Sequence, residues 1–199
     1  MKIKFLTKIL AAIVAASTVA ITPGFSSAIL PESKAYIQSI EGRRLNLNEI
    51  KEVINRLKEI SQEDDEAKKE VAGVVGNMAY KGLLRGYTHE EYLSITDLLK
   101  SCANSEKART KVGYAIFVMA KKNLLKEYTH TELLNITNVL ESCSKSEEAR
   151  PNVTEAIGEM VEKDLLRGYT HEELLTLTNV LTSCASNEDA QNHVAWALY

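Results

Sequence analysis

Apolar residues recur along most of this chain with the spacing of amphipathic helices. In the segment 129–143 they follow the helical period, at Leu133, Leu134, Ile136, Val139, Leu140 and Cys143. Such spacing collects the side chains on one face of an α-helix, whereas a half-buried strand would alternate apolar and polar residues. No segment shows strand-like alternation, so the pattern predicts an all-α protein.

The same pattern repeats at an interval of 41 residues. The segment Leu83–His89 recurs, with changes, at positions 124–130 and 165–171. A fixed period of this length is typical of repeat architectures, in which each unit is one small group of packed helices. The expected units are about 46–86, 87–127, 128–168 and 169–199, of which the first is diverged and the last incomplete.

Each unit is expected to hold two helices, and the first of them has a clear start signal. A threonine is followed three residues later by a glutamate in each of the three similar units. The threonine hydroxyl and the glutamate carboxylate can each bind a backbone N–H that the first helical turn leaves unpaired, which forms a capping box. The expected pairs are Thr88 with Glu91, Thr129 with Glu132, and Thr170 with Glu173.

The second helix of each unit is expected to begin at a residue that favours helix N-termini. Four equivalent positions carry such residue types. They are Asp64, Ser105, Ser146 and Asn187. At the other end, Gly86 and Gly168 are expected to close the second helices in the left-handed conformation that glycine adopts without strain.

Two-helix units with this period resemble the α-solenoid class of repeat proteins. The period matches HEAT and armadillo repeats rather than tetratricopeptide repeats, whose period is about 34 residues. The segment 146–150, followed by Val153, Ala156 and Ile157, looks like the second helix of a HEAT unit. The resemblance covers about residues 46–199 and implies an α-solenoid of stacked helix pairs. It identifies no narrower family and carries over no functional residue.

The first 28 residues are expected to form a signal peptide outside the fold. Three lysines precede an apolar stretch of 13 residues, Ile9–Ile21. The small residues Ser26 and Ala28 fit cleavage after Ala28. An uncleaved membrane anchor is the less favoured alternative, because a spanning helix needs about 20 apolar residues. The chain is therefore expected to be exported to the periplasm, cell surface or medium of a bacterial source, with no membrane span after cleavage. Residues 29–45 then form an N-terminal segment with a short helix.

Composition and charge remove several classes of function. The chain has 24 basic and 27 acidic residues, with a net charge of −3 and no basic block, so nucleic acid is not the expected partner. Its three cysteines are an odd number and cannot form a fully paired disulfide framework. They recur with the 41-residue step and are expected to be small buried residues at the ends of the first helices. These cysteines are Cys102, Cys143 and Cys184.

No catalytic constellation is present in the sequence. It lacks a Ser-His-Asp order, a His-Glu-x-x-His helix and a glycine-rich phosphate loop. His89, His130 and His171 stand in the first turn of successive first helices, where an exposed polar role is expected. A metal site or an enzyme that uses this row of histidines is the least favoured alternative. The prediction is a non-catalytic protein with no cofactor and no metal.

Positions that change between units are the best candidates for contact with a partner, because positions that stay constant serve the fold. Two changing series on the second helix lie three residues apart and therefore share one face. Their aromatic members suggest a strip that binds a protein or peptide, and the equally weighted alternative is that they fill gaps between units. The aromatic members of the two series are Tyr114, Phe117, Trp196 and Tyr199, and Tyr80 is expected to lie near them.

The last unit suggests self-association as an alternative to partner binding. Its second helix is expected to be about two turns shorter than the others, which would leave apolar surface around Met160 and Val161 uncovered. Either a longer parent protein or a second copy would cover this surface, the latter as a homodimer through the C-terminal repeat. The favoured function is an exported scaffold that binds a protein or peptide. The alternative is a self-associating structural or envelope component.

Overall fold

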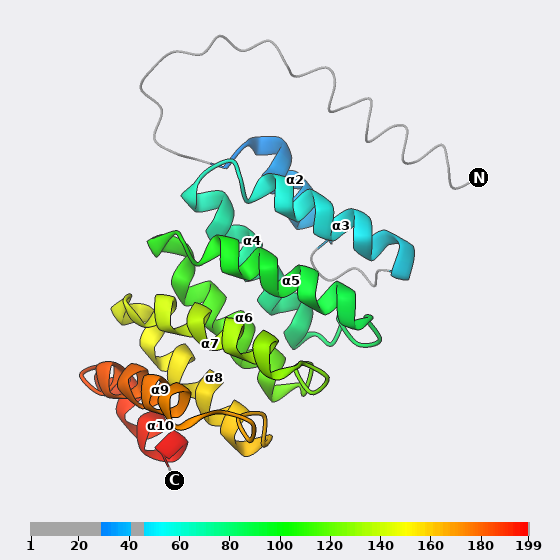
Figure 1. Cartoon of the computed structure of the whole chain (residues 1–199). Helices are drawn as coiled ribbons and strands as arrows, with labels where there is room; N and C mark the ends of the chain where they lie inside the picture. The colour runs from blue at the N-terminus through cyan, green and yellow to red at the C-terminus, as the bar shows by residue number, and fades with distance from the viewer. Residues whose placement is uncertain (1–28, 41–45, 199) are drawn as a thin grey trace.

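The computed structural model describes residues 29–40 and 46–198, apart from the side chains of residues 47, 48, 50 and 51 (Figure 1). Within this range the chain forms nine α-helices and no strand, which confirms the all-α prediction. The predicted signal peptide, residues 1–28, lies outside the described residues, and so does Tyr199. The helices are α2 (Pro31–Ile40), α3 (Leu47–Ile60), α4 (Asp65–Tyr80), α5 (His89–Cys102), α6 (Arg109–Lys121), α7 (His130–Ser144), α8 (Arg150–Glu162), α9 (His171–Cys184) and α10 (Glu188–Leu198).

The helices lie in two layers (Figure 1). Helices α3, α5, α7 and α9 follow one another in the first layer, and each contacts the next. Helices α4, α6, α8 and α10 do the same in the second layer, where α2 packs against α4. Each helix of one layer also contacts a helix of the other, so every unit packs mainly against its neighbours.

The core runs between the layers through all the units. On α6 the buried stripe consists of Val112, Ala115, Ile116 and Met119, and the 41-residue step reproduces it on α4 and α8. Burying a valine, isoleucine or methionine side chain contributes about 1.5–3 kcal/mol. Because the buried side chains are spread over every unit, the stabilising free energy is distributed along the chain.

Capping boxes open the first-layer helices α5, α7 and α9. In α7 the backbone N–H of Glu132 donates to Thr129 Oγ1 at 3.4 Å, and the backbone N–H of Thr129 donates to Glu132 Oε2 at 2.7 Å. Helix α3 begins in the same way with a pair that sequence reasoning missed. Asn46 N–H donates to Glu49 Oε2 at 2.9 Å, and Glu49 N–H donates to Asn46 Oδ1 at 3.0 Å.

Changing Thr129 to alanine should lower the free energy of unfolding by about 1 kcal/mol, because the Glu132 N–H loses its acceptor. Thr129→Ser keeps the hydroxyl and should be nearly neutral. Denaturant unfolding followed by circular dichroism measures both variants. Equal losses for serine and alanine would show that the hydroxyl cap is not what Thr129 contributes.

The second-layer helices start in two different ways. Asp64 Oδ1 accepts from the backbone N–H of Ala67 at 2.7 Å before α4, and Asn187 Oδ1 accepts from Ala190 at 3.1 Å before α10. These two caps agree with the sequence expectation.

The caps expected at Ser105 and Ser146 are wrong. Neither side chain makes a capping hydrogen bond. At both places the chain first forms a short 3₁₀ turn, Glu106–Ala108 or Glu147–Ala149, and the α-helix begins only after it. The tighter turn satisfies the first backbone groups locally, and the Ser105 hydroxyl is buried without a hydrogen-bond partner.

The second-layer helices also end earlier than expected. Gly82 has a φ of 72°, and the equivalent Asn123 and Asp164 have φ values of 60° and 58°. After α4, the backbone N–H of Leu83 donates to the carbonyl of Met78 at 2.9 Å, as in a Schellman motif. Asparagine and aspartate tolerate the left-handed conformation better than other side chains, so they can replace glycine here.

The expected helix-closing role of Gly86 and Gly168 is therefore wrong. Gly86 does have a positive φ, of 86°, but it lies in the loop beyond the end of α4. Gly168 is not among the described glycines with a positive φ. The sequence motif around these glycines stood out because it repeats, whereas the residues that close the helices differ between units.

Candidate functional site

The candidate partner-binding residues fall into two groups on the second layer. Tyr80 ends α4, and Tyr114 and Phe117 lie on the neighbouring helix α6, with 6.4 Å between the centroids of their rings. Trp196 belongs to α10, on the far side of α8. The aromatic strip is thus not continuous, and Tyr199 lies outside the described residues.

Glycines in the second layer make room for two of these rings. A Cβ atom added to Gly76 would lie 2.8 Å from Cδ1 of Tyr114, and one added to Gly158 would lie 2.2 Å from Cζ3 of Trp196. Both rings therefore fill space between adjacent helices, as the alternative interpretation expects. Tyr80 differs from them, because it is 63% exposed.

Lysines lie over the two remaining rings. The Nζ atom of Lys122 is 5.6 Å from the centroid of the Tyr80 ring, and the Nζ atom of Lys121 is 5.1 Å from that of Phe117. Both distances suit attraction between a cation and the face of an aromatic ring. We call Tyr80, Tyr114, Phe117, Lys121 and Lys122 the aromatic–lysine patch.

Histidines connect successive first-layer helices, which sequence reasoning did not foresee. His89 Nε2 lies 3.1 Å from Oε1 of Glu132, and His130 Nε2 lies 3.1 Å from Oε1 of Glu173. The His130 ring also meets the Tyr169 ring edge to face, with 5.1 Å between centroids. His89 and His130 thus each contact the capping glutamate of the next unit, whereas His171, in the last unit, makes no such contact within the described residues. The constant spacing from histidine to glutamate was visible in the sequence, but its meaning depends on how the units stack.

Hydrogen bonds keep these glutamates charged. Burial opposes ionisation of Glu132, but hydrogen bonds from Thr129 and the contact with His89 outweigh it and lower the pKa of the carboxyl group. The backbone N–H of Thr170 is the main cause of the lowered pKa of Glu173. Both side chains are therefore carboxylate acceptors at neutral pH.

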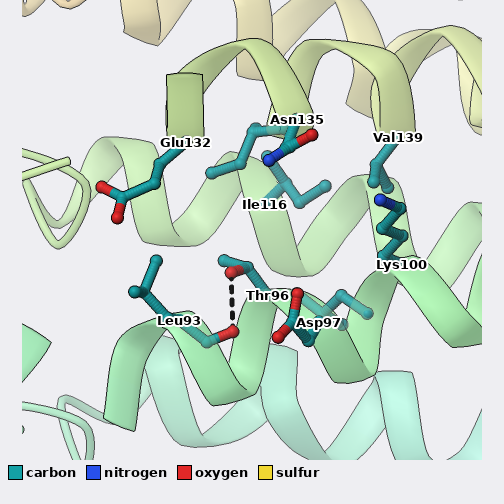
Figure 2. Close-up of a pocket in the computed structure, with 10 residues that line it drawn as sticks. Leu93, Thr96, Asp97, Lys100, Ile116, Glu132, Asn135 and Val139 are labelled. Atoms are coloured by element: carbon teal, nitrogen blue, oxygen red, sulfur yellow. Dashed lines mark hydrogen bonds between the residues drawn. The ribbon is translucent and has the colours of Figure 1, made fainter. Parts of the chain in front are cut away.

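A small cavity lies between α5 and α7, beside Ile116 of α6 (Figure 2). Its volume is about 40 Å³, and Asp97 and Lys100 lie at its polar edge. Thr96 Oγ1 donates to the carbonyl of Leu93 at 2.9 Å, so this hydroxyl is already engaged (Figure 2). The cavity has room for a water molecule or two, whereas sites for small molecules usually measure about 300–1,000 Å³.

The three cysteines are free and fully buried, as the sequence predicts. Burial raises the pKa of Cys102 and of Cys143 to about 12, and it also raises the pKa of Cys184. Thiols in this state are poor nucleophiles because the thiolate is the reactive form.

The native protein should therefore resist thiol reagents. At pH 8, we expect Ellman's reagent to react with none of the three buried thiols on the time scale of minutes, and with all three after unfolding in guanidinium chloride. The absorbance of the released thiolate measures both. Rapid reaction of one thiol in the native protein would contradict the burial of these side chains.

The end of the second layer is better covered than expected. Met160 is fully buried, which corrects the prediction of its exposure, whereas Val161 is 41% exposed and the equivalent Ala120 is buried. The last helix is shorter at its C-terminal end, as expected, but by less than two turns. Leu198, where α10 ends, is equivalent to Ile157, and α8 continues from there to Glu162.

The described residues include neither a metal-binding cluster nor a helix suited to span a membrane. Among them, no group of three or more histidine, cysteine, aspartate or glutamate side chains is placed to hold a metal ion. No helix in residues 29–40 and 46–198 is both long enough and apolar enough to cross a membrane.

The histidine–glutamate contacts and the aromatic–lysine patch are the two features whose roles a similar protein of known function could suggest. No protein-family model, no curated protein and no solved structure matches the chain.

Proposed function

We propose that this chain is an exported, non-catalytic α-solenoid scaffold that binds a protein or peptide through its second layer. The 41-residue period and the contacts between equivalent helices of successive units support the solenoid. Stacked repeats offer extended surfaces to partners. Export rests on the predicted signal peptide, and the absence of catalysis rests on the sequence.

The observation that carries this proposal is the exposure of a position that varies between units. Tyr80 is 63% exposed, and the equivalent positions hold Lys121 and Glu162. By contrast, the cysteines, which are constant in three units, are fully buried. An exposed aromatic ring at the end of α4, next to the helix that carries Phe117, has the character of a contact residue, since aromatic side chains are enriched at protein interfaces.

Selection of binding peptides tests the proposed function. The probe is a phage library of random twelve-residue peptides, selected on the immobilised full chain. We expect selected peptides to lose at least about tenfold in affinity for the double variant Tyr80→Ala with Phe117→Ala, because aromatic anchors often carry much of the binding free energy.

The matched control is the pair Lys100→Ala and Lys145→Ala, which removes two exposed side chains at the first layer. It should leave peptide affinity unchanged, and circular dichroism should show that both double variants are folded. Failure to enrich any peptide, or an equal loss in both variants, would overturn the proposal.

Exposed apolar residues at the last unit favour self-association as a second function. Leu174 is 41% exposed and Leu175 is 52% exposed, whereas Leu133, which is equivalent to Leu174, is 5% exposed. On α10, Trp196 is 42% exposed. Sedimentation over a range of concentrations separates the two functions. Association that is lost in Leu175→Glu would support self-association, and a monomer at high concentration would exclude it.

A further inference from the structure

We infer that the aromatic–lysine patch binds an acidic peptide segment that also carries aromatic side chains. The inference rests on the proposed function, because it names the kind of partner for the same surface. It is supported by the charge of the residues around the patch. This charge differs from that at the corresponding end of the second helix in the next unit.

In the third unit, the lysine at the end of α8 is neutralised by two glutamates. Lys163 Nζ lies 3.7 Å from a carboxylate oxygen of Glu159 and 3.1 Å from one of Glu162. In the second unit the equivalent lysine is Lys122, but valine replaces the first glutamate and Lys121 replaces the second. The net charge at the C-terminal end of the second helix is therefore negative in the third unit and positive in the second.

The lysines of the patch have no carboxylate partner within the described residues. Lys121 and Lys122 form no ion pair within 4.0 Å, and the neighbouring Lys81 forms none either. Their ammonium groups instead lie beside aromatic rings or in solvent. Both kinds of group, the cation and the ring, thus remain available to a ligand on one surface.

Helix ends explain part of this arrangement but not all of it. A cation is favourable near the C-terminus of a helix, where backbone carbonyl groups are unpaired. This accounts for Lys81, Lys122 and Lys163, which recur at the same position in three units. It does not account for Lys121, because the equivalent residues are Tyr80 and Glu162.

A short acidic segment fits this surface better than a long polyanion. The whole chain has 27 acidic residues and a net charge of −3, so a nucleic acid or an anionic membrane would meet repulsion beyond the patch. On the adjacent helix α8, Glu155 is nearby in register, but it lies 3.4 Å from His193 of α10. The positive region is local, and a peptide can match its size.

Fluorescence anisotropy tests the charge of the partner. The probe is a fluorescein-labelled twelve-residue peptide in which glutamate, aspartate and tryptophan alternate. We expect it to bind the full chain, and we expect the pair Lys121→Glu with Lys122→Glu to weaken binding by about tenfold or more. Binding should also weaken as salt is raised, because exposed charges are screened.

The matched control is Lys100→Glu with Lys145→Glu, which changes the net charge by the same amount at two exposed lysines elsewhere. It should change affinity by less than about twofold. Equal weakening by both pairs would overturn the inference. So would equal binding of a peptide with lysine and arginine in place of the acids, or tighter binding of oligothymidylate or phosphatidylserine vesicles.

The peptide selection described above separates this inference from the proposed function. Enriched peptides that are acidic and aromatic support both. Enriched peptides that are neutral or basic leave partner binding in place but overturn the acidic assignment. Failure to enrich any peptide overturns the proposed function itself.

Discussion

Replacing Leu140 with alanine should lower the free energy of unfolding by about 2–5 kcal/mol. Leu140 lies on α7 and is fully buried, and α7 contacts α5, α6, α8 and α9. The truncation therefore removes apolar contacts and leaves a cavity that the surrounding helices fill only in part. Denaturant unfolding followed by circular dichroism measures the change.

Leu175→Ala is the matched control for this variant. It makes the same chemical change on α9 at a side chain that is 52% exposed, so its effect should stay within about 0.5 kcal/mol. Similar losses of unfolding free energy in Leu140→Ala and Leu175→Ala would contradict the burial of Leu140 between the helices.

Replacing Gly158 with alanine should separate α10 from α8 locally and cost about 1–3 kcal/mol. The new Cβ atom would lie 2.2 Å from Cζ3 and 2.3 Å from Cε3 of Trp196, so the indole ring has to leave its place. The chain has 1 tryptophan, and its fluorescence reports this movement directly. We expect the emission to shift to longer wavelength, because the displaced ring gains contact with water.

Gly73→Ala serves as the control, because the nearest atom to its added Cβ is Cδ of Lys111 at 3.9 Å. This substitution should stabilise the protein by about 0.5–1 kcal/mol, since alanine favours a helix interior more than glycine does. An unchanged emission spectrum in Gly158→Ala would show that Trp196 does not lie against α8.

Features that depend on near neighbours in the chain were predictable from the sequence. The capping boxes need only a threonine and a glutamate three residues later, so Thr129 and Glu132 identify the start of α7 without knowledge of the rest of the fold. The burial of Cys143 follows in the same way from the apolar spacing of that helix.

Features that depend on the next unit were not predictable in the same way. Ser146 belongs to a good capping type, yet the turn that follows it is 3₁₀ and leaves the cap unused. The contact between His130 and Glu173 joins residues 43 positions apart and exists only because two units stack in one register. The fit of Trp196 over Gly158 likewise requires the spacing of α8 and α10.

Two shared glutamates, Glu132 and Glu173, link helix formation to docking at the last two junctions. Glu132 Oε2 accepts a hydrogen bond from the backbone N–H of Thr129 at the start of its own helix. Its other oxygen, Oε1, contacts Nε2 of His89 in the preceding unit. The first turn of a helix is the costly step in its formation, and this carboxylate contributes to that turn. A preceding unit that is already folded holds the same group in position, so it lowers the cost of nucleating the next helix. Folding that begins in the second or third unit is thereby favoured to propagate across the next junction.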